Sequence, residues 1–590
     1  MYVRTVNVPS SNGTVNQYVR IVQAYRQDGK VKQRVIADLG RKDLLAALLP
    51  QLQRVLKGDQ AMVGQEHDDG QLKVLEAAAW GPMLVVRELA SRIGLSEILD
   101  RTFGPAVEQD AQEPAAPPVE RALLLVANRL IRPGSEHALA GWLESDWVCD
   151  RQGRRLIPCW ERKGRVKVAH RQLDRWYRTL DRLTKVKDQV EVELYGRLRD
   201  LFSLKVDLVL YDITSTYFEG SGPEELARFG HSRDGKSQNV QVVVGVVMAG
   251  GWPIAHHVFA GNTVDVTTVK DVVADLGKRF GLGRVVFVGD RGMVSAKNLN
   301  DLVGDGHGYL VGLRRRGNPK VDQWLLKVQE QAWVDCPGGI NARERKEPLR
   351  TRVQEIATGD ESQRVFVIDS EERRAYEEAQ RTKSMQRTLQ KLQNLQKRVD
   401  SGALTDAEQI GAAAARAQSA HHGHRYYRWS LEKGKFRFEE DPKRLGAEKR
   451  LEGRYVIATS EKDFGALQAV AAYKQLTEVE RGFRSLKDVI RLRPVWHHSA
   501  SRVKGHIFVA ALALLLERVL EKLLKEAGVD LSARDALLAV ATIRHVRFEV
   551  AKQLRTGVTA GSAQARQVIA ALGIHDLRPP TPPKGEQQVV

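Results

Sequence analysis

Residues 205–220 read KVDLVLYDITSTYFEG, an apolar and β-branched run with one acidic residue, Asp212, near its middle. Such a run, ended by a glycine, predicts a β-strand. Two more strands are expected at 238–250 (QNVQVVVGVVMAG) and 251–262 (GWPIAHHVFAGN), joined by a Gly-Gly turn. Together the three strands predict an antiparallel meander.

After the meander, strands alternate with helices. The expected elements are a helix at 264–281, a strand at 284–292, a helix at 295–306 and a strand at 308–315. The complete order, β-β-β-α-β-α-β, is that of a ribonuclease H-like core, although other α/β domains satisfy the same order. The predicted fold class is therefore α/β. It has a ribonuclease H-like core with a mixed five-stranded sheet, interrupted by an α+β insertion and preceded by a mainly helical N-terminal region.

The rest of the chain divides where the pattern changes. Alternating residues around Asp28-Gly29 predict a β-hairpin. The basic helical patterns before residue 205 are interpreted either as a DNA-binding region or as solvated faces. An apolar, heptad-like stripe predicts a helical arm and consists of Met385, Leu389, Leu392, Leu395 and Val399. The expected segments are an N-terminal β-hairpin segment (1–45), a helical region (46–204), the first part of the core (205–314), an insertion (315–450), the second part of the core (451–530) and a C-terminal helical segment with a disordered tail (531–590).

Charge and cysteine content limit the class of protein. The chain of 590 residues has 92 basic and 73 acidic side chains, a formal net charge of +19. Nucleic acid is the favoured partner, because contacts with phosphates release counterions. Three cysteines exclude a disulfide framework and an all-cysteine zinc site. The first residues lack a signal-peptide pattern and the longest apolar run, Ile507–Leu516, has 10 residues, so we expect a cytoplasmic protein with no membrane partner.

Two aspartates have the context of a metal site. Asp212 lies within the first strand of the meander, and Asp290 ends the fourth strand just before a glycine-containing turn. The first and fourth strands are neighbours in a sheet of this order, so the two carboxylates are expected side by side. A hard divalent cation such as Mg²⁺ relieves their repulsion. Each aspartate alone is also compatible with a structural carboxylate on a strand.

A third carboxylate, Glu480, lies in the helical pattern AAYKQLTEVERGFRSLK at 471–487. Seven residues make nearly two helical turns, so Tyr473, Glu480 and Lys487 are expected on one stripe, with Arg484 at its edge. A carboxylate bordered by a phenol, an ammonium and a guanidinium fits a metal ligand beside a phosphate. The alternative is an ordinary Glu–Arg pair on a solvated helix face.

The blocks YDITSTYFEG (211–220), VGDRGMVS (288–295) and Tyr-x6-Glu-x6-Lys (473–487) together resemble the DDE transposases of bacterial insertion sequences. The resemblance is to the insertion-sequence-four group, whose last block is a Tyr–Arg–Glu–Lys signature on the helix carrying the Glu. It covers roughly 205–314 and 451–525. The Arg of that signature would fall at Leu476, which leaves a hairpin intermediate or another route of strand transfer open.

This resemblance implies a DNA transposase that cleaves at the terminal inverted repeats of its element and joins the ends to target DNA. Asp212, Asp290 and Glu480 would then be catalytic and would hold two Mg²⁺ ions, with Mn²⁺ expected to substitute. The resemblance further implies a homodimer in the DNA complex and association with the bacterial nucleoid when bound. The side chains expected to contact DNA are Tyr473, Lys487, Arg484, Arg481 and Lys236.

The residues alone leave two rival functions open. A ribonuclease H-like nuclease or resolvase would share the metal site but would not join strands. A catalytically inactive DNA-binding repressor is the second rival, and the three intact acidic positions argue against it. The histidine pairs and the HHGH run at 421–424 invite a zinc interpretation, but without cysteines or helical i,i+4 spacing they do not predict a zinc site.

Overall fold

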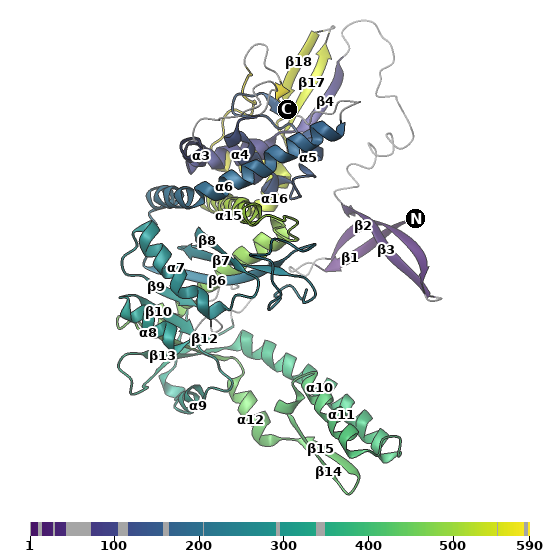
Figure 1. Ribbon diagram of the computed structural model, residues 1–590, viewed down its shortest axis with the longest axis vertical. Helices are drawn as coiled ribbons and strands as arrows, with labels where there is room; N and C mark the ends of the chain where they lie inside the picture. Colours follow the sequence, from purple (N-terminus) through teal and green to yellow (C-terminus); the bar gives the residue numbers. More distant parts are fainter. Residues whose placement is uncertain are drawn as a thin grey trace. The chain divides into compact units, whose positions relative to one another are not determined.

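The structure is a computed structural model that describes residues 2–9, 15–27, 30–42, 72–103, 116–156, 165–204, 206–290, 295–337, 349–550, 553–582 and 588–589 (Figure 1). The chain divides into two compact units. The first comprises Met1–Glu76, Asn341–Glu347 and Val546–Thr556, and the second comprises Ala77–Ile340, Pro348–His545 and Gly557–Val590. Every residue of the candidate site described below belongs to the second unit.

The N-terminal segment forms an antiparallel sheet of β1 (Tyr2–Pro9), β2 (Val15–Gln27) and β3 (Lys30–Arg41), in that order. Gln27 pairs with Lys30, in agreement with the hairpin predicted around Asp28-Gly29, two residues that lie outside the described part of the chain. β1 pairs along the length of β2. The segment is therefore a three-stranded sheet and not a hairpin alone.

A second small sheet has the order β18-β17-β4 and consists of β4 (Lys73–Ala79), β17 (Arg544–Val550) and β18 (Gln553–Val558). The C-terminal segment was predicted to be helical, and it does contain α16 (Ala533–Val540) and α17 (Ala563–Ala571). Its two strands correct that prediction; the alternating stretch RHVRFEV at 544–550 carried the signal for them. The tail predicted to be disordered likewise includes β19 (Gln588–Val589), which pairs with β5 (Arg155–Leu156).

The predicted core order is present in the largest sheet. β6 (Leu208–Tyr217), β7 (Gln241–Ala249) and β8 (Trp252–Ala260) form the antiparallel meander, and β9 (Val286–Gly289) and β10 (Gly308–Gly312) add in parallel on the other side of β6. The intervening helices are α7 (Asp265–Phe280) and α8 (Ala296–Gly304). β7 is buried at every residue, because helices cover both faces of the sheet.

The sheet has nine strands instead of the predicted five, in the order β11-β12-β13-β16-β10-β9-β6-β7-β8. The additional strands are β11 (Val334–Asp335), β12 (Thr351–Ile356), β13 (Arg364–Ser370) and β16 (Arg454–Thr459). β16 pairs with both β10 and β13, so the first strands of the predicted insertion continue the core sheet. The core of β13 (VFVID) is wholly buried, as expected for a strand inside a covered sheet.

The remainder of the insertion is a helical arm with its own hydrophobic cluster. Leu392, Leu395 and Val399 are buried in this cluster, and Met385 and Leu389 pack against it, so the predicted apolar stripe faces the interior of the arm. The elements from β10 to β16 outside the sheet are α9 (Pro319–Leu326), η1 (Glu330–Ala332), α10 (Glu371–Asp400), α11 (Ala407–Ser419), η2 (Gly423–Arg425), β14 (Tyr427–Glu432), β15 (Lys435–Glu440) and α12 (Pro442–Leu451).

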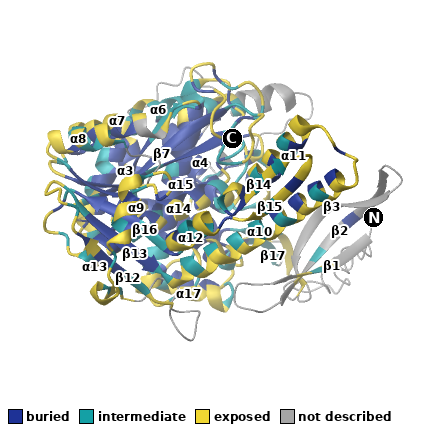
Figure 2. Cartoon of the chain, turned by 90° about the horizontal axis from the view of Figure 1, so that it is seen from below, coloured by how far each residue is buried: buried dark blue, intermediate teal, exposed yellow. Residues whose placement is uncertain are grey.

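Helices from both ends of the second unit pack together around α15 (Ala500–Glu526). Figure 2 shows the contrast between the buried strands and α15 and the largely exposed α10. The helices that precede the sheet are α2 (Gly81–Arg92), α3 (Leu95–Phe103), α4 (Pro118–Ile131), α5 (Leu139–Ser145) and α6 (Arg165–Phe202). No helix in the described ranges is both long and apolar enough to cross a membrane.

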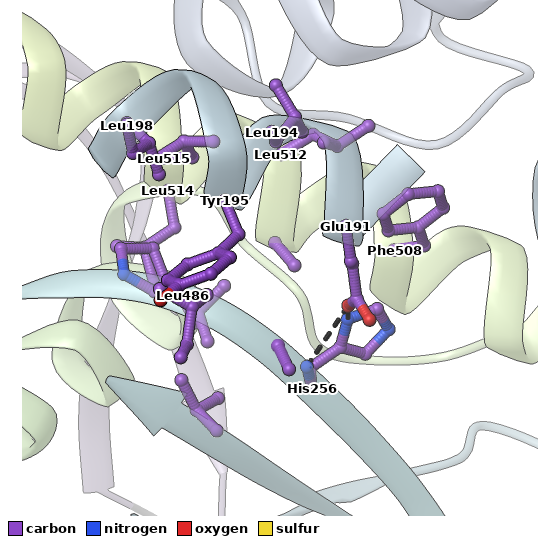
Figure 3. Close-up of a pocket in the computed structure, with 15 residues that line it drawn as sticks. Glu191, Leu194, Tyr195, Leu198, His256, Leu486, Phe508, Leu512, Leu514 and Leu515 are labelled. Atoms are coloured by element: carbon purple, nitrogen blue, oxygen red, sulfur yellow. Dashed lines mark hydrogen bonds and ion pairs between the residues drawn. The ribbon is translucent and has the colours of Figure 1, made fainter. Parts of the chain in front are cut away.

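Helix α6 is joined to the sheet through a buried carboxylate. Glu191 accepts a hydrogen bond from the backbone N–H of His256 on β8 (3.1 Å), and its carboxylate lies 2.7 Å from the Nδ1 atom of the same histidine. Figure 3 shows this pair at a small cavity of about 30 Å³, whose lining includes leucines of α6 and α15. The polar pair therefore fixes how the helical region packs on the sheet.

Candidate functional site

Asp212 and Asp290 lie at the same level on adjacent strands. β6 and β9 are parallel, with Leu210 paired to Val288. Two residues further along each strand, the same register places Asp290 beside Asp212. Asp290 follows β9 directly, and Asp212 lies in the middle of β6. Side chains of adjacent strands at one level point to the same face, so the sequence-based expectation of neighbouring carboxylates follows from the observed pairing.

Glu480 is brought to these aspartates by α14 (Leu476–Arg484), which follows α13 (Ala466–Lys474) and continues into a π-helical turn, η3 (Ser485–Val489). The buried face of α14 consists of Leu476, Val479, Gly482 and Phe483. This apolar face packs toward the sheet, where α14 contacts β6. Glu480 lies at the edge of that face and is exposed, so its carboxylate borders the open space beside β6.

The three acidic residues line one cavity of about 360 Å³. Three basic side chains, Arg233, Arg484 and Lys487, also line the cavity. The remaining lining residues are Ile213, Thr214, Phe483 and Asp488. Carboxylate oxygens together with guanidinium and ammonium groups in one cavity suit a hard divalent cation and a phosphate ester.

Asp212 is a buried carboxylate whose surroundings disfavour its charged form. Burial raises its pKa to about 7, and the charges of Asp290 and Glu480 add to that rise, while the backbone N–H of Ile213 (2.8 Å) and the charge of Arg233 oppose it. A carboxyl group in this environment gains from a bound cation, because the cation offsets both the burial and the repulsion.

Tyr473 reaches Asp290 through a gap left by a glycine. The phenol donates to Asp290 Oδ1 (3.3 Å), and burial followed by the charge of Asp290 raises the pKa of this tyrosine. Gly312, on β10 next to Asp290, faces the phenol: a Cβ atom there would lie 2.2 Å from Tyr473 Oη and 3.4 Å from Asp290 Oδ1. The absence of a side chain at Gly312 therefore makes the Tyr473–Asp290 contact possible, a role that the sequence analysis did not assign to this glycine.

Lys487 is held by a buried aspartate that the sequence analysis also missed. Its Nζ atom donates to Asp234 Oδ1 (2.8 Å), and Arg493 donates to the same oxygen. The side chain of Asp234 is 4% exposed. Burial lowers the pKa of Lys487, while Asp234 opposes that shift. The HSRDGKS loop between β6 and β7 contained this aspartate, but nothing local in the sequence indicated its partner.

The other predicted DNA-contact residues are spread over different surfaces. Arg484 lines the cavity, whereas Arg481 is bonded to Glu521 (2.7 Å) and is not among the cavity residues. The ammonium of Lys236 lies over the ring of Tyr217, 5.7 Å from its centroid. Leu476 is buried, so this position, where the resembling signature has an arginine, serves packing.

A separate buried cluster joins Glu136, His497 and His506, whose candidate ligand atoms all lie within 4.8 Å of one another. The guanidinium of Arg129 lies 2.9 Å from His506 Nδ1 and 3.6 Å from Glu136, and it also donates to the backbone of Arg491 (3.2 Å). A permanent positive charge beside the candidate ligands opposes a cation. We interpret this cluster as a tie between α4 and the segment that follows the Glu480 helix.

Comparison with known protein families gives two matches. Residues 3–69 match the family described as IS1634 family transposase, N-terminal domain, and residues 207–516 match the family described as Transposase DDE domain. The second match covers more than half of the 590 residues and includes all three cavity carboxylates. No curated protein was found to match the chain.

Proposed function

The chain belongs to the DDE transposases, as the sequence resemblance predicted, and on that premise we propose how it acts: it cleaves DNA at the terminal inverted repeats of an insertion sequence and joins the ends to target DNA. The observation that carries this proposal is the shared cavity. Asp212, Asp290 and Glu480 come to it from three separate elements and lie beside Arg233, Arg484 and Lys487. Carboxylates that bind cations, next to groups that bind phosphate, are what phosphodiester chemistry requires.

We propose that the core of the sheet is ribonuclease H-like. The strand order β10-β9-β6-β7-β8, with a meander on one side of β6 and parallel strands on the other, supports this assignment. The central strand then carries Asp212, and its parallel neighbour leads into Asp290.

The acidic residues fit two Mg²⁺ ions, with Mn²⁺ as a substitute, because all three donors are carboxylates and Asp212 is destabilised in its charged form without a cation. When bound, such ions prepare the attacking oxygen and stabilise the leaving oxygen of an in-line displacement. Asp212, Asp290 and Glu480 would hold them. The family implies dependence on a divalent metal, and the identity and number of the ions are part of this proposal.

The basic residues of the cavity would orient the DNA. Lys487 and Arg484 bind the phosphates next to the scissile bond, and Tyr473 keeps Asp290 in position through its hydrogen bond. Arg481 and Lys236 lie outside the cavity walls and would contact DNA farther along the duplex. Because two ends must be held together for joining, the active complex is proposed to be a homodimer.

The test is a cleavage and joining assay with Mg²⁺, a duplex bearing the element's own terminal repeat, and a target duplex. Nicking and joining by the wild type, with neither by Asp290→Asn, would support the proposal. Nicking without joining would instead identify a nuclease. Binding with no cutting in Mg²⁺ or Mn²⁺ would contradict catalysis by these carboxylates.

A further inference from the structure

Helix α10 of the arm carries an uninterrupted positive charge on its outer face. Between residues 381 and 399 it has six basic residues and no acidic one. Five of them are exposed, and four of these, Lys383, Arg387, Lys391 and Arg398, follow one face of the helix. At about 100° per residue, these four fall within a sector of roughly 80°, and the buried leucines of the helix lie on the other side. We call these four side chains the basic stripe.

Ion pairs elsewhere on the arm set the basic stripe apart from several of its basic neighbours. Five arginines of the arm are ion-paired: Arg373 with Glu377, Arg374 with Asp369, Arg381 with Glu452, Arg428 with Glu439 and Arg444 with Asp441. Arg416, Arg425, Arg437 and Arg450 are scattered over other elements of the arm and, within the described ranges, have no carboxylate within ion-pair distance. Among the residues that the structure describes, no carboxylate is recorded within 4.0 Å of any of the four side chains of the stripe. What distinguishes the stripe is that four such charges lie together on one face of one helix.

Polar donors surround the stripe. Asn394 lies in the same sector and Gln390 lies just beside it, and both are exposed. His421, at the end of α11, is close enough that Lys391 and Arg387, after desolvation, contribute to lowering its pKa. No large apolar residue interrupts the stripe, which argues against a membrane surface, since interfacial helices bury an apolar face beside their basic one.

We propose that the basic stripe binds the phosphate backbone of duplex DNA at a position outside the catalytic cavity. From Lys383 to Arg398 the helix rises about 22 Å, which corresponds to roughly six base pairs at 3.4 Å each. Lysine and arginine contacts to phosphates hold a duplex in register without reading its sequence. The stripe therefore adds affinity and orientation for any duplex that extends beyond the cleavage point. This inference rests on the proposed function and adds a second DNA surface to it.

The test compares two triple variants of the full chain. Lys383→Gln/Arg387→Gln/Lys391→Gln removes three charges from the stripe. Its control, Arg350→Gln/Arg428→Gln/Arg444→Gln, removes three exposed arginines that are paired with Asp335, Glu439 and Asp441. The two variants have the same net charge, so a difference between them reports where the charge was lost. Equal melting temperatures establish that both are folded.

Binding is measured over a series of salt concentrations on a terminal-repeat duplex and on a scrambled duplex of equal length. The stripe variant should bind both duplexes at least about tenfold more weakly than the control. The slope of log affinity against log salt should become shallower by about 2.7, at roughly 0.9 per lost phosphate contact. Equal affinities and slopes for the two triple variants would overturn the inference.

Failure of this inference and failure of the proposed function give different results. If the wild type nicks and joins ends while the two triple variants bind alike, the stripe is not a DNA surface and the transposase proposal stands. If the wild type neither nicks nor joins while the stripe variant alone loses DNA affinity and salt dependence, the stripe inference stands and the catalytic proposal fails.

Discussion

Asp212 and Glu191 are two buried carboxylates in opposite surroundings. Burial alone would raise the pKa of Glu191, but His256 (2.7 Å), Lys187 (2.7 Å) and Arg279 (2.8 Å) hold it well below its ordinary value. Burial instead raises the pKa of Asp212 to about 7, and the charges of Asp290 and Glu480 add to this shift while Arg233 opposes it. The fold supplies the counter-charge for Glu191 from its own side chains. For Asp212, the charge of Arg233 does not offset the burial and the two neighbouring carboxylates.

The largest expected effects come from replacing one carboxylate with its neutral amide in the cavity, at Glu480, and one in the buried cluster, at Glu191. Glu480→Gln should lower DNA cleavage by at least about a thousandfold with little change in stability, because a proposed metal ligand is lost. Glu191→Gln should instead destabilise the fold by roughly 3–5 kcal/mol, since Arg279 and Lys187 would lose their partner in a buried site. Cleavage assays and denaturant unfolding measure the two effects. A Glu480→Gln protein that still cuts would remove this residue from the site.

Asp212→Asn should show the effect of the raised pKa as a difference in folding stability from the wild type that depends on pH. An acid whose pKa rises from 3.8 to about 7 on folding binds its proton more tightly in the folded state, so the folded state loses stability as the pH increases through this window. The Asp212→Asn variant does not have this loss of stability, because asparagine carries no titrating proton. In a chelator, the stability of Asp212→Asn relative to the wild type should therefore increase by about 4 kcal/mol between pH 4 and pH 8, at about 1.4 kcal/mol per pKa unit.

Adding Mg²⁺ at pH 8 is the control for this pH effect. It should stabilise the wild type more than Asp212→Asn, because only the wild type has the full set of charged oxygens. A difference between the two proteins that is the same at every pH would contradict the assigned environment of Asp212.

Asp234→Asn should have a moderate effect on DNA handling. Lys487 and Arg493 share Asp234, so its neutralisation should lower the pKa of Lys487 further and weaken binding of end DNA by about tenfold. As the pH is raised, cleavage by the variant should also begin to decrease at a lower pH than cleavage by the wild type, because the ammonium of Lys487 loses its proton at a lower pH. Asp488→Asn is the matched control, since Asp488 pairs with Arg493 and is 61% exposed. Equal binding and pH profiles for the two variants would show that Asp234 does not position Lys487.

Gly312→Ala should have the smallest effect, a several-fold decrease in cleavage. The new methyl group would displace the phenol of Tyr473 from Asp290. In a Tyr473→Phe background the same change should cost less, since the oxygen in closest contact is gone. A double-mutant cycle measures this coupling. Additive effects would mean that Gly312 does not act through Tyr473.

Several parts of the fold and the candidate site were accessible from local pattern. The apolar run around Asp212 and the strands and helices that alternate after the meander indicated the order of the core elements. The seven-residue spacing of Tyr473, Glu480 and Lys487 indicated one helix. The structure brings the three acidic residues to one cavity, and their catalytic role stays a proposal. The continuation of the sheet by β12 and β13 was missed, because a short strand does not specify which edge it will pair with.

By itself the sequence determined the family, the order of the core elements and which three acidic residues are candidates for the site. These depend on periodicity and on motifs of neighbouring residues. Only the tertiary structure decided that Asp234 holds Lys487 and that Gly312 makes room for Tyr473. Asp234 and Lys487 are 253 residues apart in the chain. Their contact follows from the packing of a loop against a helix, and packing depends on the whole fold and not on local sequence.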